Sequence, residues 1–146
     1  MIIDWGANYE GYFSDITRTF AIGNDVDSEL LKAYECVKQA NNSAREKAKS
    51  GVEAGLVDKA ARNVIDSAGF GQYFTHRTGH GLGLEIHEEP YIKPSNDFLL
   101  QKGMTFTIEP GIYIPNLGGI RIEDDIYLEP DNALSLTNLS RDLLFL

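Results

Sequence analysis

The sequence is poor in cysteine, histidine and positive charge, and it has no long apolar run. A single cysteine, Cys36, excludes a disulfide framework and predicts a small packed side chain in a reducing compartment. No apolar stretch approaches the ~20 residues that span a bilayer, and no charged segment leads into an apolar one as in a signal peptide. We therefore expect a cytoplasmic protein without a membrane partner.

The excess of acidic over basic residues limits which kinds of molecule the protein can bind. Lys and Arg number 13 and Asp and Glu number 22, so the formal net charge is −9. Nucleic-acid binding depends on clustered basic residues, which this chain does not have, so nucleic acid is excluded as a partner. An excess of carboxylates suits cations instead. The 146 residues, of which 42% are hydrophobic, predict one domain with a core of ordinary size.

All three histidines, His76, His80 and His87, lie in one stretch, HRTGHGLGLEIHEEP at 76–90. Three interspersed glycines argue against a zinc-peptidase helix, because glycine is unfavourable inside helices. In an extended segment, alternation puts His76 and His80 on one face and His87 on the opposite face. A metal site here would need most of its ligands from elsewhere in the chain.

The remaining pattern predicts an α+β domain with a hairpin near each end. Two β-rich runs, 1–6 and 11–23, flank the turn-prone ANYEG. Apolar residues at helical spacing predict one helix from residue 27 or 28 to Gly51 and a second that stops at Gly69. The alternating runs MTFTIEPGIYI and GIRIEDDIYL, joined around PNLGG, predict the second hairpin, and a short extended tail follows.

Both predicted hairpins bring two carboxylates together. If the first one turns at Asn8–Gly11, Asp4 faces Asp15, and a three-residue turn in PNLGG makes Glu109 face Glu123. Directly opposed like charges repel across a sheet, so the pairing is unfavourable unless something neutralises it. A lone strand carboxylate is usually a solvated side chain, but two such pairs predict a site for two divalent ions. Oxygen ligands with one imidazole suit Mn²⁺, Co²⁺ or Zn²⁺.

Four segments, in this order, resemble the Xaa-Pro peptidase branch (proline dipeptidase and aminopeptidase P) of the pita-bread metallopeptidases: DWGANYEGYFSDITRTF, HRTGHGLGLEIHEEP, TIEPGIY and GIRIEDDI. The resemblance runs over nearly the whole chain. It implies the C-terminal portion of the pita-bread (creatinase/aminopeptidase-like) fold, with helices on the outer face of a curved antiparallel sheet. It also implies a dinuclear centre, with Mn²⁺ preferred, whose ligands are Asp4, Asp15, His80, Glu109 and Glu123.

The resemblance implies roles for other residues and a reaction. His87 would contact the substrate and steady the tetrahedral centre, and His76 would lie near the proline side. Arg121 would pair with a ligand carboxylate, and Glu109 would also take a proton from the water between the metals. The implied reaction is hydrolysis of the bond before proline, in Xaa-Pro dipeptides or at the N-termini of proline-containing peptides.

The resemblance further implies that residues 1–146 are a partial catalytic domain, without its upstream half and any N-terminal domain. We therefore expect the chain alone to be inactive, to bind metal weakly and to form homo-oligomers through uncovered apolar faces. The alternative function is a non-catalytic binding or assembly module, as in the pita-bread domains of histone chaperone subunits; creatinase uses the fold without metal. The histone chaperone domains and creatinase both lack the metal-ligand set, which this chain has.

Overall fold

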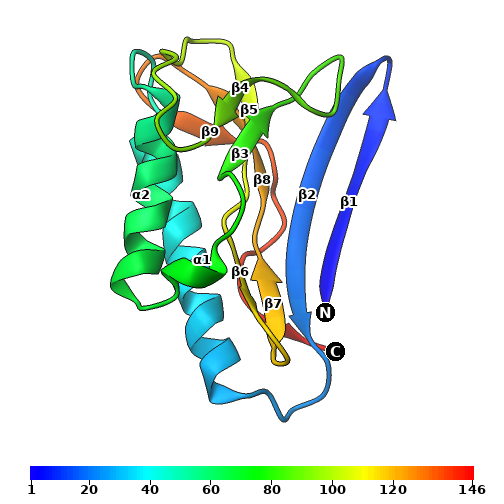
Figure 1. Ribbon diagram of the computed structural model, residues 1–146. Helices are drawn as coiled ribbons and strands as arrows, with labels where there is room; N and C mark the ends of the chain where they lie inside the picture. Colours follow the sequence, from blue (N-terminus) through cyan, green and yellow to red (C-terminus); the bar gives the residue numbers. More distant parts are fainter.

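The computed structural model describes residues 1–146 and has the predicted α+β class. Figure 1 shows two helices on one side of a central sheet and a long hairpin, β1–β2, on the other. The central five strands run in the order β4-β3-β5-β8-β9, β6 pairs with β7, and the hairpin pairs with β10. The elements are β1 (Ile2–Tyr9), β2 (Tyr12–Ala21), α1 (Ser28–Lys47), α2 (Ala54–Ser67), η1 (Gly71–Tyr73), β3 (Gly79–Gly81), β4 (Glu88–Ile92), β5 (Thr105–Ile108), β6 (Gly111–Ile114), β7 (Gly118–Arg121), β8 (Asp124–Leu128), β9 (Ala133–Ser135) and β10 (Leu144–Phe145).

Both predicted helices form, and their ends follow from local chemistry. The Asp27 carboxylate caps α1 by accepting a hydrogen bond of 2.7 Å from the backbone N–H of Glu29. The helix ends at Lys47, short of the predicted Gly51, because Ala48 turns into extended backbone. The second helix ends at Ser67, and Gly69 follows with a φ of 84°, which glycine adopts without strain.

The two helices cover the sheet with small side chains and share one apolar core with it. The α1 face carries several alanines, which let the helix lie close to its neighbours, and Cys36 is buried as predicted. No helix has the length and apolar character needed to cross a membrane. The core cluster contains 21 buried residues, among them Ala33, Val37, Ala40, Ala44, Val57, Ala61, Ile65, Phe106, Ile108, Ile122 and Ile126.

The first hairpin forms, but its predicted pairing of Asp4 with Asp15 is wrong. Asp4 lies opposite Thr17, and Asp15 lies opposite Gly6. The turn is the two-residue Glu10–Gly11, with φ angles of 52° and 91°, which matches the type favoured in tight hairpins. A turn placed one residue later shifts every cross-strand pair by two positions. Because faces alternate with period two, the two aspartates still share a face, as diagonal neighbours.

The second hairpin has the predicted register, with its turn at Pro115–Leu117. Glu109 and Glu123 lie outside the strands, in a gap between two hydrogen-bonded ladders. Pro110 cannot donate a backbone hydrogen bond, which interrupts the ladder at this point. The register continues unchanged on either side of the gap, as the pairs Ile108 with Asp124 and Gly111 with Arg121 show. The two glutamates therefore face each other.

The histidine stretch is less extended than predicted, and the parity argument for it is wrong. Strand β3 covers only 79–81, residues 82–87 are irregular, and β4 begins at Glu88. Because the chain reverses between β3 and β4, alternation does not run through it. The centres of the His80 and His87 rings lie 4.2 Å apart. His76 lies before β3 in the chain.

Candidate metal centre and active site

Four carboxylates and one imidazole meet where the hairpin crosses the central sheet. They come from β1, β2, β3 and the two sides of the gap beyond β5 and β7. Potential ligand atoms lie within 4.8 Å of one another in each of three overlapping groups. The structure thus brings together all five residues predicted as ligands, Asp4, Asp15, His80, Glu109 and Glu123, and one of the groups also contains His87.

The imidazole of His80 presents a free nitrogen to the carboxylates. Its Nδ1 lies 3.0 Å from the carbonyl oxygen of Gly81, which assigns the proton to Nδ1. Its Nε2 lies 3.4 Å from Glu109 and 3.8 Å from Asp15. Burial lowers the pKa of His80 to about 4, so the ring is neutral near pH 7 and Nε2 keeps its lone pair.

Three of the carboxylates, those of Asp15, Glu109 and Glu123, have raised pKa values, and burial is the first cause of each shift. Burial and the neighbouring Glu109 raise the pKa of Glu123 to about 9. Burial also raises the pKa of Glu109 to about 7, and burial together with Asp4 raises the pKa of Asp15 to about 6. A divalent cation would oppose these shifts, since it favours the charged form of a neighbouring carboxylate. The composition of the cluster is therefore that of a site for divalent cations.

Arg121 and Thr17 orient two members of the cluster. The Thr17 hydroxyl donates to Glu123 at 2.5 Å and accepts from Nε of Arg121 at 3.2 Å. Arg121 also forms an ion pair with Asp4 and donates to the Tyr113 hydroxyl at 2.9 Å. The expected pairing of Arg121 with a candidate ligand carboxylate is therefore present. The carboxylates of Asp4 and Glu123 are therefore each held by a specific donor.

The two remaining histidines take different places. His87 is exposed, and its ring meets that of His80 edge to face. His76 is half-buried, and its Nε2 lies 3.0 Å from the Tyr113 hydroxyl. Since Arg121 donates to the same hydroxyl, Tyr113 links His76 to the arginine that holds Asp4. His76 is thus connected to the cluster without belonging to it.

Three residues that shape the site were not predicted: Thr17, Tyr113 and Asp125. Asp125 accepts a 3.0 Å hydrogen bond from the backbone N–H of Asp15, which fixes β2 against β8. Tyr113 has the same strand parity as Glu109, so alternation could have placed it on this face. Thr17 has the same strand parity as Asp15, so alternation could also have placed it on this face, but its position opposite Asp4 depends on the corrected hairpin register.

A buried ion pair supports the backbone behind the cluster. Arg18 and Asp124 are 2% and 0% exposed, and they lie 2.7 Å apart. Arg18 also donates to the backbone carbonyls of Thr17 and Glu123 at 2.8 and 2.6 Å. Asp124 accepts further hydrogen bonds from Arg141 and Asn41, which joins α1 to β8. Removal of the Asp124 carboxylate would leave the charge of Arg18 buried and unpaired, which is strongly destabilising.

Beside the cluster lies a pocket of about 530 Å³ with a wholly polar lining. Glu109 belongs to both the pocket and the cluster, so the pocket opens onto the candidate metal site. The lining residues are His76, Arg77, His87, Lys93, Glu109 and Arg121. Three of the predicted site residues outside the ligand set, His76, His87 and Arg121, therefore face one cavity.

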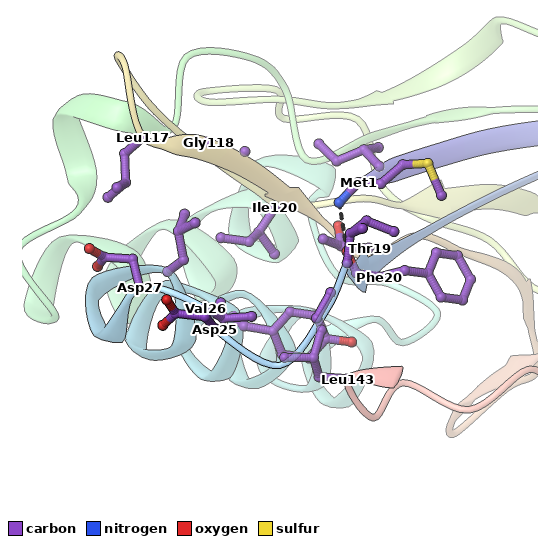
Figure 2. Close-up of a pocket in the computed structure, with 16 residues that line it drawn as sticks. Met1, Thr19, Phe20, Asp25, Val26, Asp27, Leu117, Gly118, Ile120 and Leu143 are labelled. Atoms are coloured by element: carbon purple, nitrogen blue, oxygen red, sulfur yellow. Dashed lines mark hydrogen bonds between the residues drawn. The ribbon is translucent and has the colours of Figure 1, made fainter. Parts of the chain in front are cut away.

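A second pocket, of about 460 Å³, is mostly apolar and lies at the other end of the hairpin. Figure 2 shows it between the end of β2, the start of α1 and β7, where the amino group of Met1 donates to the carbonyl of Phe20. Its lining includes Leu30, Ile120 and Leu143 and shares no residue with the carboxylate cluster. The apolar pocket is therefore separate from the carboxylate cluster, whereas the polar pocket adjoins it through Glu109.

Several known proteins resemble the chain in sequence and in fold. The chain is 47% identical over 144 residues to the Xaa-Pro dipeptidase of Pyrococcus furiosus. The alignment covers 99% of this chain and 41% of that protein. The crystal structure of a dipeptidase from Pyrococcus horikoshii OT3 superposes with a TM-score of 0.95 and 55% identity, over 99% of this chain and 40% of the other. The N-terminal domain of FACT complex subunit SPT16 from chickpea has a TM-score of 0.89 and 27% identity, over 96% of this chain and 35% of the other.

The chain spans about 40% of the length of the curated relatives that it matches. The structural matches confirm the predicted pita-bread fold. Metallopeptidase family M24 matches residues 1–130, which is most of the chain. The chain therefore belongs to metallopeptidase family M24.

Proposed function

We propose that this chain forms the metal-binding part of an Xaa-Pro peptidase, which hydrolyses the bond before proline in dipeptides or at peptide N-termini. The observation that carries the proposal is the convergence of four carboxylates and a neutral imidazole in a member of this family. The substrate class is supported by relatives that are named Xaa-Pro dipeptidases and are 45–47% identical.

The proposed ligands are Asp4, Asp15, His80, Glu109 and Glu123. Four carboxylates and one imidazole offer mostly hard oxygen ligands, which suit two ions of Mn²⁺, with Co²⁺ or Zn²⁺ as alternatives. The raised pKa values of three of the carboxylates support this assignment, because close buried carboxylates need a cation to ionise together near neutral pH.

Bound divalent ions would polarise the scissile carbonyl and make a water molecule acidic near neutral pH. Glu109 lies at the border of cluster and pocket, so its carboxylate is placed to accept a proton from the attacking water and to pass it on to the leaving nitrogen. His87, beside His80 on the pocket side, would donate a hydrogen bond to the oxygen of the tetrahedral carbon. Arg121 would hold Asp4, and His76 would contact the proline residue.

Chelation tests this function directly. A form of the protein as long as its relatives is stripped with EDTA and assayed on Ala-Pro and on Ala-Ala before and after Mn²⁺ is added. We expect Mn²⁺ to restore hydrolysis of Ala-Pro in preference to Ala-Ala, and metal analysis to find two ions per active chain. Hydrolysis that survives complete removal of metal would exclude the proposed chemistry.

We also propose that residues 1–146 are part of a larger catalytic domain and are inactive by themselves. Apolar side chains on the hairpin support this, since Trp5 is 41% and Tyr9 77% exposed. Such surface favours association, so we expect homo-oligomers. Comparing the turnover of this chain with that of a form as long as its relatives tests the point. A cytoplasmic location, with neither nucleic acid nor membrane as partner, fits the net charge of −9 and the buried Cys36.

A second candidate function is a non-catalytic binding or assembly module. The similarity to the SPT16 domain favours it, because that protein has the same fold within a complex subunit. Metal titration separates the two functions. A catalytic chain binds Mn²⁺ through its carboxylates, and Asp15→Asn weakens that binding; a chain that never binds metal supports the module.

A further inference from the structure

An ion pair on α2 contacts the η1–β3 segment, residues 74–78, which has no regular secondary structure. Nε and Nη2 of Arg62 donate to the two carboxylate oxygens of Asp58 at 3.0 and 2.9 Å. Charged residues four apart on a helix usually pair at the surface, where they add little to stability. Here the Asp58 side chain is only 1% exposed. Apolar side chains would fill this position without removing charges from water, so the pair points to contacts outside its own helix.

Both members of the pair bind the η1–β3 segment. Arg62 donates to the backbone carbonyls of Phe74 and His76 at 3.1 and 3.0 Å. Its guanidinium also lies 4.2 Å from the centre of the Phe74 ring. The Asp58 carboxylate accepts a 2.8 Å hydrogen bond from the buried hydroxyl of Thr78. Side chains one helical turn apart on α2 thus hold both ends of the segment.

The η1–β3 segment reaches the polar pocket at two points. The imidazole of His76 is part of the pocket lining. The backbone carbonyl of Thr78 accepts a 2.7 Å hydrogen bond from the backbone N–H of Glu109, which lines the same pocket and belongs to the carboxylate cluster. Arg62 therefore holds the backbone of His76 directly, and Asp58 acts on Glu109 through Thr78.

The helix that carries the pair is a rigid support. On α2, Val57, Ala61 and Ile65 are fully buried in the core. An irregular segment lacks the backbone hydrogen bonds of a helix or strand and moves more readily unless side chains hold it. Reacting groups need such support, since a misplacement of about 1 Å can cost roughly 10²-fold in rate.

We propose that Asp58 and Arg62 are positioning residues of the peptidase, and that each controls a different step. The inference rests on the proposed function. Arg62 fixes His76 beside the proline residue and thereby sets the strength of substrate binding. Asp58 fixes Glu109 through Thr78 and thereby sets the rate of proton transfer. Neither residue touches the substrate.

The first test separates KM from kcat in the Mn²⁺-loaded protein, in a form as long as its relatives. Arg62→Lys keeps a positive charge beside Asp58, but an ammonium cannot replace the planar fork together with both carbonyl contacts. We expect KM for Ala-Pro to rise by about tenfold with little change in kcat. Thr78→Val removes only the hydroxyl that donates to Asp58, and should lower kcat by about tenfold with little change in KM.

Two further variants are controls. Thr78→Ser keeps the hydroxyl that Asp58 accepts, so its kcat should match that of the wild-type protein. Arg45→Lys makes the same exchange as Arg62→Lys on the other helix. Because the side chain of Arg45 donates only to Asn41 and Asn42 of α1, this variant should change neither kcat nor KM.

The second test does not depend on activity. Hydrogen exchange of the metal-free protein, followed by mass spectrometry, should show faster exchange in the η1–β3 segment of Arg62→Lys and around Glu109 in Thr78→Val. Exchange in α1 should match that of the wild-type protein in both variants. A local change of this kind separates positioning from a general loss of stability.

Two outcomes would overturn the inference and leave the proposed function standing. One is wild-type kinetics in both Arg62→Lys and Thr78→Val. The other is the same combined change of kcat and KM in both variants, with faster exchange throughout the chain, which would mean that the ion pair only stabilises the fold. A wild-type protein that does not hydrolyse Ala-Pro would refute the proposed function and with it both assigned steps. Hydrogen exchange alone would then decide whether the pair orders the segment.

Discussion

The helix-backed sheet and the β1–β2 hairpin both supply candidate ligands, but they are held in place differently. Behind the sheet, Phe106 and Ile108 are fully buried in the shared core, whereas every residue of β1 after Ile2 is exposed. At the site the hairpin is joined to the sheet by polar bonds, such as Thr17 to Glu123. The sheet therefore offers a rigid half of the site and the hairpin a more weakly held half. A bound cation would join the two.

The largest expected effect tests the rigid half. Glu109→Gln in the active, metal-loaded protein removes the carboxylate that would accept the proton, so kcat should fall by roughly 10² to 10⁴. Glu10→Gln makes the same chemical change at the exposed hairpin turn and should have no effect. Steady-state assays on Ala-Pro measure both, and circular dichroism checks the fold. Near wild-type turnover by Glu109→Gln would show that another group takes the proton.

The second prediction compares packing in the two regions. Phe106→Ala leaves a cavity in the core and should cost about 3–5 kcal/mol of unfolding free energy. Tyr9→Ala removes a side chain of similar size that is 77% exposed, and should cost about 0.5 kcal/mol or less. Urea unfolding measures both. Similar costs at the two positions would mean that the hairpin is covered by an interface in solution.

The third prediction concerns the cation that joins the halves. At a Mn²⁺ concentration 100 times Kd, mass action should stabilise the chain by about 2.7 kcal/mol. Hydrogen exchange should show the greater gain in protection in β2, near Asp15, and a smaller one in α1. Asp15→Asn should reduce both effects. If Mn²⁺ protected α1 and β2 equally, the hairpin would not be the weakly held half.

The last prediction concerns the pH dependence of the metal-free chain. Glu109 and Glu123 have folded pKa values of about 7 and 9, above the ordinary 4.5, so folding favours their protonated forms. That stability is lost as pH rises toward 9, at a rate of about 1.4 kcal/mol per pH unit for one group. His80 acts oppositely, because its pKa of about 4 removes stability only as pH falls below 6.5. Thermal melts should therefore show declining stability from pH 6.5 to 9, and Mn²⁺ should suppress the decline. A metal-free chain whose stability rises over this range would contradict the assigned burial.

Sequence periodicity was a good guide where one side of an element is buried. The helices ending near Gly51 and Gly69 were predicted because their apolar faces pack on the sheet over many residues. The register at Glu109 and Glu123 was predicted because the three-residue turn leaves little freedom. Periodicity failed for His80 and His87, since two short strands joined by an irregular segment do not keep one alternation.

The first hairpin shows why a partly wrong register still located the site. Asp4 and Asp15 were placed opposite each other, and they are diagonal neighbours instead. An error of one residue in the turn preserves the face, so the carboxylates remained together. It did not preserve the partner, so Thr17, which lies opposite Asp4 and donates to Glu123, was missed.

The sequence by itself determined the fold class, the family resemblance and the set of carboxylates, because these depend on residue type, order and parity. Only the tertiary structure decided how the five candidate ligands meet and that Tyr113 connects His76 with Arg121. The physical reason is that these contacts join strands far apart in the chain. The distances between these side chains depend on how the hairpin crosses the sheet and on which buried groups form hydrogen bonds. Local sequence patterns do not predict either.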